Sequence, residues 1–366
     1  MWPPWGNRNG CPTMLGGLRR EEGKAKAMYK NKFQQLRAIK EGHFLEFAQD
    51  SASCVLCPDV AGRIFAEIGG LSVHRIDLDC VAKPDRPFNN YGGGNFWPAP
   101  EGGRFGFNHR GSEWYVQECI NKQPFEVVSH DAESAVISKR IVLINRAGTS
   151  VESIMKRVLT LPRSLPPFLN GKRLRAFLTY QTTDTFEVLN SVAPDKALIG
   201  AWTLEQFDTS ESTVAFCPVE NPSSAINFDF YEHPKDRITY FKHGFGYKMD
   251  GRCKEQIGIK KAAAAPFIGF HDASRQLLCT RENRSGESVY FNMADNDQPN
   301  GPYSAADNYS IFNSDPDMQA FELETVSGAR IQDGLVKGSE LVSVTTFAKF
   351  ENPRDLQDFV DQHLGG

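Results

Sequence analysis

The chain has 366 residues, 40% of them hydrophobic, and its 41 lysines and arginines nearly balance 45 aspartates and glutamates, for a net charge of −4. This length allows two ordinary domains, or one large β architecture with a substantial core. The near balance of charge argues against a nucleic-acid partner, because proteins that bind nucleic acids usually carry a concentrated basic face.

Residues 1–45 are expected to form an N-terminal extension. Residues 1–17 lack the basic-then-apolar layout of a secretory signal and have a composition typical of disorder, whereas residues 20–41 can form a charged helix. No run of about 18 apolar residues is present, so no membrane-spanning helix is predicted. We therefore expect a cytoplasmic protein, or a periplasmic one if an export signal has been lost from the start.

The cysteines and histidines do not indicate a metal site. Cys54 and Cys57 form a C-x-x-C pair in a strand-like run, but no second pair is present to complete a zinc site. The histidines are scattered without ligand spacing. We expect reduced, mostly buried thiols, no metal and no cofactor.

Residues 46–350 are expected to form one large β domain. Short β-like runs follow one another, separated by the Gly, Pro, Asn and Ser residues that tight turns need. Since no helical patterns alternate with them, a parallel α/β sheet is excluded, and roughly fifteen to twenty strands without a linker favour one antiparallel sandwich. The clearest runs are residues 71–79, 133–148, 149–162, 173–192 and 340–350.

The last segment, residues 351–366, is predicted to be a helix that packs on this domain. Asn352 is a suitable N-cap and Pro353 suits the first helical position. The sequence thus predicts an all-β fold with short helices at both ends.

The stretch 89–111, NNYGGGNFWPAPEGGRFGFNHRG, combines three consecutive glycines with several large aromatic rings. Glycines allow positive φ or a close approach of backbones, and sugar sites commonly combine aromatic rings with carboxylates, amides and basic groups. An alternative is that the rings cap one end of the sandwich and the glycines only permit turns. The candidate ligand-binding residues in and just after this stretch are Trp97, Glu101, Asn108, His109, Arg110 and Trp114.

A second candidate segment is MQAFELETVSG, residues 318–328. On a strand, Glu322 and Glu324 point to the same face. Two neighbouring carboxylates repel each other, so at least one should have a raised pKa if the face is partly buried, as a general base or acid near neutral pH requires. The alternative is that this face is solvated and both are ordinary surface groups.

Three further polar residues depend on their surroundings. Asn300, in a segment rich in amides, is a candidate ligand for hydroxyl groups, and His243 lies beside aromatic residues at a strand end. For Asn300 an ordinary loop explains the sequence nearly as well, and a lone histidine at a strand end such as His243 is more often structural or solvated. Glu205 lies in an apolar run with Trp202 and would need a pairing partner if buried.

The early YGGGNFWPAPE element, the long middle of antiparallel strands and the late FELET strand together resemble the galactose mutarotase-like superfamily. The likeness covers residues 54–350 and is closest to uncharacterised bacterial members. It implies a β-supersandwich with a sugar site on a concave face.

The resemblance also implies an activity, that of an aldose 1-epimerase acting on a carbohydrate without a cofactor. Glu324 matches the general base of the family's late LET-like strand, with Glu322 as its neighbour. The family's paired histidine motifs are not present, so His109 is the first choice for the general acid and His243 the second.

Two other functions are compatible with the same residues. A non-catalytic carbohydrate-binding protein needs only the aromatic rings and amides, whereas a sugar-cleaving hydrolase or lyase needs a second carboxylate. Glu101 with Glu324 is the pair that we nominate for the latter. Neither the sugar nor the oligomeric state follows from the sequence.

Overall fold

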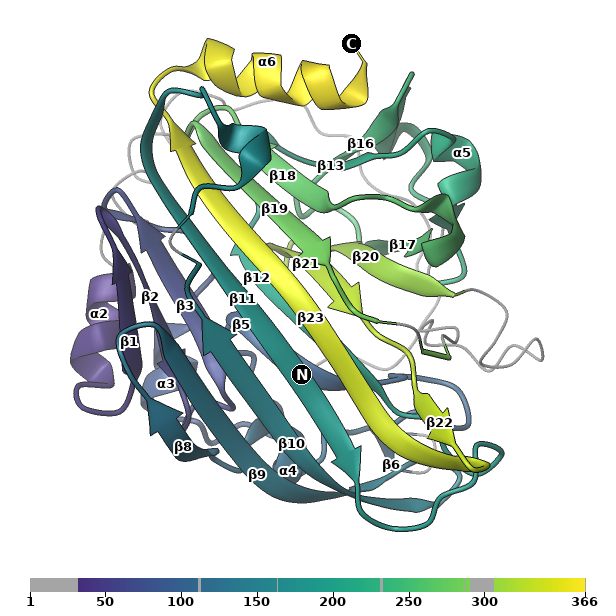
Figure 1. Ribbon diagram of the computed structural model, residues 1–366. Coiled ribbons are helices and arrows are strands. Elements are labelled where there is room, and N and C mark those ends of the chain that lie inside the picture. The colour runs from purple at the N-terminus through teal and green to yellow at the C-terminus, as the bar shows by residue number, and fades with distance from the viewer. Residues whose placement is uncertain are drawn as a thin grey trace.

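The computed structural model describes residues 32–110, 113–162, 164–230, 233–286, 288–289 and 306–365. Within these residues, nearly all strands belong to two large antiparallel sheets that lie face to face, with short helices near both ends of the chain (Figure 1). The prediction of an all-β fold with short terminal helices is therefore confirmed.

Sheet I is the ten-stranded sheet of the described residues, and it carries the candidate site. Its strands are β1 Leu45–Gln49, β2 Ala52–Cys57, β3 Arg63–Ile68, β4 Leu71–Ser72, β5 Gly93–Ala99, β12 Gly200–Asp208, β14 Ile226–Asn227, β17 Glu255–Lys260, β20 Asp307–Asn313 and β21 Ala320–Val326. They are ordered β1-β2-β3-β5-β12-β21-β20-β17-β14, with β4 paired to β3. Strands far apart in sequence, such as β5, β12 and β21, are thus neighbours.

Sheet II is the eleven-stranded sheet, again counted over the described residues. Its strands are β8 Glu126–His130, β9 Ser134–Ile144, β10 Ser150–Thr160, β11 Leu174–Val188, β13 Thr213–Pro218, β15 Ile238–Phe241, β16 Gly244–Lys248, β18 Ile268–Asp272, β19 Leu277–Asn283, β22 Arg330–Gln332 and β23 Leu335–Phe350. The order is β15-β16-β13-β18-β19-β23-β11-β10-β9-β8, with β22 paired to β23. A separate hairpin joins β6 His109–Arg110 to β7 Glu113–Trp114.

Aromatic side chains fill the space between the sheets. Phe96 of sheet I packs against Phe186 of sheet II with ring centroids 4.7 Å apart, and Phe207 packs against Phe270 at 4.8 Å. Because side chains alternate along a strand, these rings occupy the inner face of sheet I, and the residues between them point to its outer face. That outer face lies behind β11 and β23 in Figure 1.

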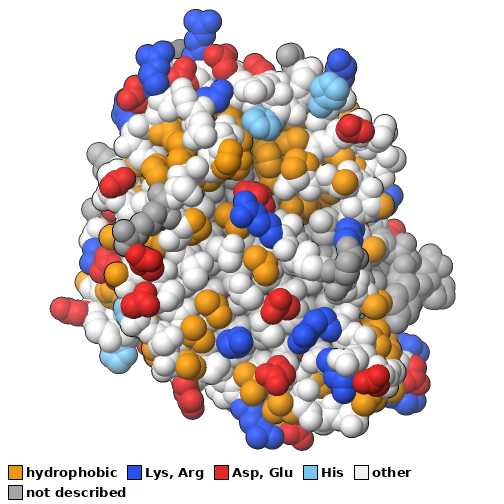
Figure 2. Space-filling view, viewed as in Figure 1, with side chains coloured by type: hydrophobic (Ala, Val, Ile, Leu, Met, Phe, Trp, Pro, Cys, Tyr) orange, Lys and Arg blue, Asp and Glu red, His pale blue; other side chains and the backbone are white. Residues whose placement is uncertain are grey.

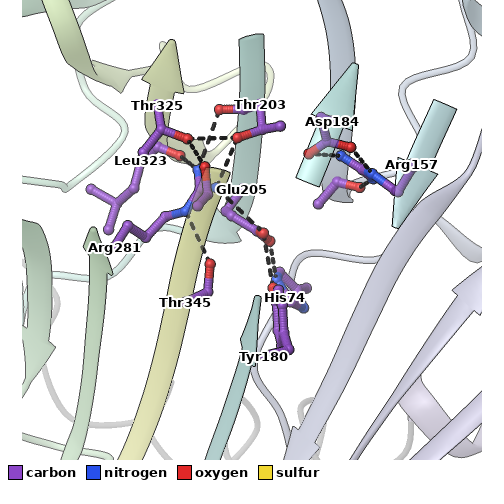
Figure 3. Close-up of polar contacts among 12 residues, drawn as sticks. His74, Arg157, Tyr180, Asp184, Thr203, Glu205, Arg281, Leu323, Thr325 and Thr345 are labelled. Atoms are coloured by element: carbon purple, nitrogen blue, oxygen red, sulfur yellow. Dashed lines mark hydrogen bonds and ion pairs between the residues drawn. The ribbon is translucent and has the colours of Figure 1, made fainter. Parts of the chain in front are cut away.

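Buried polar groups also bridge the two sheets (Figure 3). Glu205 on β12 accepts hydrogen bonds from Tyr180 on β11, at 2.8 Å, and from the Nε2 of His74, at 2.7 Å. Arg281 on β19 lies 3.7 Å from Glu205 and donates to the carbonyl of Leu323 on β21 at 2.6 Å. Burial favours the neutral acid, but Arg281 and the bond from His74 outweigh it and lower the pKa of Glu205 to about 2. Glu205 therefore has the partners that its burial requires.

A second ion pair supports the same arrangement. Arg157 on β10 binds the carboxylate of Asp184 on β11, with Nε 2.6 Å from Oδ1. Its Nη1 also donates to the carbonyls of Gly62 and Gly94, at 2.8 and 3.2 Å, which belong to the side of sheet I. Both bridges use side chains of sheet II to satisfy backbone carbonyls of sheet I.

The helices cover edges of the sandwich. They are α2 Lys32–Ile39, α3 Leu78–Ala82, α4 Glu118–Asn121, α5 Pro222–Ala225 and α6 Pro353–Leu364, with single 3₁₀ turns at Pro167–Leu169, Lys235–Arg237 and Lys261–Ala263. The apolar side of α6, including Leu356 and Phe359, packs on Phe350 and Phe216 of sheet II. None of the helices among the described residues is long and apolar enough to cross a membrane.

The face of sheet II shown in Figure 2 carries interspersed acidic and basic side chains, with hydrophobic side chains gathered beneath α6. This mixture agrees with the near balance of charge in the whole chain.

Two local expectations from the sequence are wrong. Residues 71–79 do not form one strand, because Asp77 accepts a hydrogen bond from the backbone N–H of Cys80, at 2.9 Å, and starts α3 after the short strand β4. Cys253 is disulfide-bonded rather than reduced. The cysteines that are free in the described residues are Cys54, Cys57, Cys80, Cys119, Cys217 and Cys279.

Candidate functional site

Glu324 lies near the middle of the outer face of sheet I. It is on β21, directly opposite Leu204 on β12 and Ser310 on β20. Phe321 and Leu323 of the same strand belong to the core between the sheets, so the alternation of side chains directs Glu322 and Glu324 to the other face. The shared face predicted for the two glutamates follows from this arrangement.

Neutral donors hold the carboxylate of Glu324. The indole Nε1 of Trp202 donates to Oε2 at 3.0 Å, and the Nε2 of Gln256 lies 3.2 Å from Oε2 and 3.3 Å from Oε1. Gln256 is itself oriented by a 2.8 Å hydrogen bond to the hydroxyl of Ser310. Glu324 is only 1% exposed, and no lysine or arginine of the described residues forms an ion pair with it.

Glu322 has a different set of neighbours. Its Oε1 accepts a 2.6 Å hydrogen bond from the Nε2 of Gln206, whose Oε1 accepts one from Arg75 at 3.0 Å. The charge of Arg63 also favours ionisation of Glu322. Cationic groups therefore lie on the Glu322 side of the pair.

The two glutamates compete for negative charge. Burial, followed by the charge of Glu322, raises the pKa of Glu324 well above its usual range. Burial also raises the pKa of Glu322, against the effects of Gln206 and Arg63. Since the carboxyls are close enough to hydrogen-bond, the pair retains a proton at a pH where isolated carboxyls have lost theirs. Such a pair can both accept and donate a proton.

The segment after β5 brings three predicted residues towards this pair. Glu101 accepts hydrogen bonds from the indole of Trp114, at 3.1 Å, and from the amide of Asn108, at 3.4 Å. The charge of Glu101 is one of the causes of the raised pKa of Glu324. Glu101, Asn108 and Trp114 thus form one hydrogen-bonded group in the vicinity of Glu324.

His109 and Arg110 belong to the hairpin that carries Trp114. His109 pairs with Trp114 in the register of β6 and β7. Arg110 is exposed, and its guanidinium lies 3.9 Å from the centre of the Tyr115 ring. Of the two histidines proposed as general acid, His109 is therefore the one on the same side as Glu101 and Trp114.

His243 lies elsewhere in the fold. It is exposed in the turn between β15 and β16 of sheet II, where its backbone N–H donates to the carbonyl of Leu364 at the end of α6. Neither strand belongs to the sheet that carries Glu324. The other residue of uncertain role, Asn300, lies outside the described residues.

The aromatic residues of the stretch 89–111 divide between two roles. Trp97 lies opposite Trp202 in the pairing of β5 with β12, and Phe88 makes edge contacts with both Trp97 and Trp114, at 6.0 and 5.4 Å between ring centroids. Trp97 is itself buried and belongs to the main core cluster together with Phe96, Phe105 and Phe107, while Tyr91 belongs to a second core cluster.

The three glycines serve packing within the protein. Gly92 and Gly93 have φ values of +83° and +71°, and a Cβ on Gly92 would lie 2.0 Å from the carbonyl oxygen of Arg75. A Cβ on Gly94 would lie 2.6 Å from the carboxylate of Glu205. The glycines therefore admit backbone and core groups close to β5.

Four residues that hold the glutamates in place were not predicted as site residues from the sequence: Trp202, Gln206, Gln256 and Ser310. Trp202 and Gln206 are an even number of residues apart on β12, so they share one face of the strand, and Glu205 points to the opposite face. Their position on the outer face could therefore be predicted once Glu205 is placed on the inner one. Gln256 and Ser310 carry no local signal, because only the pairing of β17, β20 and β21 brings them to Glu324.

Within the part of the chain that the structure describes, no group of three or more His, Cys, Asp or Glu residues is arranged to hold a metal ion. The side chains that the described site brings together are carboxyls, amides and aromatic rings, with His109 on the neighbouring hairpin.

Solved structures with a similar fold come from several organisms. One is an Escherichia coli K12 protein provisionally identified as an aldose 1-epimerase, with 12% identity, a TM-score of 0.49, and coverage of 83% of this chain and 98% of that one. Another is a galactose mutarotase related enzyme from Lactobacillus acidophilus, with 9% identity, a TM-score of 0.48, and coverage of 84% and 99%. A third is a galactose mutarotase-like protein from Lactobacillus casei, with 8% identity, a TM-score of 0.45, and coverage of 84% and 99%.

The comparisons by sequence give a family but no activity. A search of curated proteins gave no match. One family model matches residues 27–365, nearly the whole chain. The chain belongs to that family, described as a family of unknown function (DUF6786).

Proposed function

We propose that the protein is an aldose 1-epimerase-like isomerase that acts on a carbohydrate by acid–base catalysis, with Glu324 as the general base. The observation that carries this proposal is the Glu322–Glu324 pair on the outer face of sheet I, where Trp202 and Gln256 hold Glu324 in place. A fixed carboxyl with a raised pKa suits proton transfer near neutral pH. The resemblance of the FELET strand to the catalytic strand of the galactose mutarotase-like superfamily supports the same residue.

The proposed reaction needs one base and one acid. Ionised Glu324 takes the proton from the anomeric hydroxyl while His109 donates a proton to the ring oxygen, and the ring opens to the aldehyde. Rotation about the C1–C2 bond and closure with reversed roles give the other anomer. Each such proton transfer contributes roughly 10²–10⁴-fold to the rate.

The same proposal assigns binding roles around the glutamates. Trp97 and Trp114 would support the apolar face of the sugar, while Glu101, Asn108 and Arg110 would contact its hydroxyls. Glu322 would raise the pKa of Glu324 through its negative charge. The hydrogen bonds among Glu101, Asn108 and Trp114 support a role as one unit.

A hydrolase is the second candidate, favoured by one observation. Glu101 is near enough to Glu324 for its charge to raise the pKa of that residue. Two carboxyls of this kind on either side of a glycosidic bond could cleave it. A protein that only binds a carbohydrate would use the same face without either reaction.

The test is NMR exchange spectroscopy of the α and β anomers of D-galactose, D-glucose and D-mannose, with wild-type protein, Glu324→Gln and Glu340→Gln. Glu340 is exposed on β23 of sheet II, so its substitution is a matched control. We expect wild type and E340Q to accelerate exchange and E324Q to lose at least about 100-fold. Full activity of E324Q would overturn the role of Glu324. Saturation transfer to a sugar without accelerated exchange would support a binding protein, and release of a sugar from a 4-nitrophenyl glycoside would support the hydrolase.

A further inference from the structure

Asp307, at the start of β20, has a buried carboxyl of which only one oxygen accepts a hydrogen bond. The residue is 1% exposed, and its Oδ2 accepts a 2.8 Å hydrogen bond from the Nδ2 of Asn227 on β14. Its Oδ1 is also buried, and it has no hydrogen-bond partner within the described part of the chain. Leaving a buried acceptor without a partner is unfavourable, so such a group indicates that something else supplies a donor.

The register of sheet I places this carboxyl on the same face as Glu324. Gln256 points to that face, because its amide binds Glu324, and Gly258 follows it by two residues on β17. A Cβ on Gly258 would therefore point the same way, and it would lie 2.4 Å from the Oδ2 of Asp307. The carboxylate of Asp307 thus lies over Gly258, roughly 7 Å along the strand from Gln256.

The surroundings of Asp307 suit a hydrogen-bonding role near neutral pH. Burial raises the pKa of Asp307 to about 6, with a further increase from Asp229, while the hydrogen bond from Asn227 and the charge of Lys260 act in the opposite direction. Asn227 fixes the orientation of the carboxyl, and the absence of a side chain at Gly258 leaves the room that it occupies. Above pH 6 its free oxygen is a charged acceptor, which binds a hydroxyl more strongly than a neutral one.

We propose that Asp307 is a second ligand-binding carboxyl of the outer face of sheet I, whose Oδ1 accepts a hydrogen bond from a hydroxyl group of the carbohydrate that reaches Glu324. Asn227 and Gly258 position this carboxyl, and they are positioning residues. The inference rests on the proposed function in one respect, namely that the ligand is a polyhydroxylated molecule. It adds a contact at a different strand from those of Glu101, Asn108 and Trp114.

Binding and catalysis are measured separately to test it. Methyl glycosides of galactose, glucose and mannose cannot exchange anomers, so saturation-transfer NMR titrations with them report binding alone. The variants are Asp307→Asn, which preserves the shape of the side chain, and Gly258→Ala, whose new Cβ would displace the carboxyl. Glu340→Gln is the control on the far sheet, and thermal melts confirm that each variant is folded.

We expect D307N to raise the dissociation constant of the glycoside at pH 7.5 by at least about tenfold. G258A should raise it as well, and E340Q should bind as wild type does. Unchanged binding by both D307N and G258A would overturn the inference, even if the exchange assay supports Glu324 as the base. Conversely, weakened binding by D307N in a protein that does not accelerate anomer exchange would support Asp307 as a ligand while the proposed activity fails.

Discussion

At the scale of single residues, the carboxyl of Glu324 depends on its neighbour. Glu322 stabilises the protonated form of Glu324 through its negative charge, and Glu322 in turn is kept near Gln206 and two arginines. A single carboxyl on an exposed strand would have no neighbouring charge and no burial to change its pKa. The proton held by the pair is thus a property of two adjacent positions on one face of β21.

This dependence predicts the effect of Glu322→Gln on the pH profile of anomer exchange. Without the charge of Glu322, less energy is needed to ionise Glu324, so its pKa falls. Because the base acts in its ionised form, the acidic limb of kcat/KM should move to lower pH in E322Q, with more of the maximal activity retained at pH 5. The profile of E340Q, measured in parallel, should coincide with that of wild type. An acidic limb that stays in place or moves to higher pH would show that Glu322 does not tune the base.

At the scale of elements, the sequence was informative where the signal is local. Alternation along 318–328 was sufficient to place Glu322 and Glu324 on one face, and Asn352 followed by Pro353 marked the start of α6. The same alternation gave a wrong prediction for residues 71–79, because Asp77 caps the helix α3 and the strand does not continue through it. Local patterns therefore predict faces and helix starts better than they predict where a strand stops.

The partners of the site could not be predicted for a physical reason. Gln256 lies 68 positions before Glu324, and only the antiparallel pairing through β20 brings the two together. Asp307 lies a few residues after Asn300, but nothing in the local sequence shows that Asn227 holds it. Pairing between distant strands decides these contacts, and a single sequence does not display that pairing.

The helix α6 offers a test at this scale that should not involve the site. The side-chain oxygen of Asn352 accepts a 2.9 Å hydrogen bond from the backbone N–H of Asp355, which satisfies one of the free donors at the helix start. Asn352→Ala should therefore lower the free energy of unfolding by about 1 kcal/mol, as measured by urea denaturation. Asp358→Ala, at an exposed position of the same helix, should change it by less than about 0.5 kcal/mol. Anomer exchange should be unchanged in both folded variants, and equal destabilisation by the two would mean that the cap contributes nothing specific.

At the scale of the whole molecule, the two sheets are joined by buried charges as well as by aromatic packing. Glu205 binds Tyr180 and His74, and it is the buried counter-charge of Arg281, which also reaches across to the backbone of β21 (Figure 3). Arg281 contacts the carbonyl of Leu323, next to Glu324 in sequence. The bridge between the sheets therefore supports, from the inner side, the strand that carries the proposed base.

This bridge predicts how stability depends on pH. The pKa of Glu205 is lowered from an ordinary 4.5 to about 2 in the folded state, so its ionised form stabilises the fold above pH 4.5. That contribution, about 3 kcal/mol, is lost as the pH falls from 4.5 towards 2, because the unfolded chain takes up the proton first. Urea denaturation at pH 3.5, 5 and 7 should show wild type losing stability between pH 5 and 3.5, and Glu205→Gln losing less of it over the same interval.

E205Q should also be less stable at pH 7 by about 3–5 kcal/mol, since Arg281 is left buried without its counter-charge. E340Q should show the pH dependence of wild type. If E205Q showed it too, ionisation of Glu205 would not be the source of the stability lost between pH 5 and 3.5.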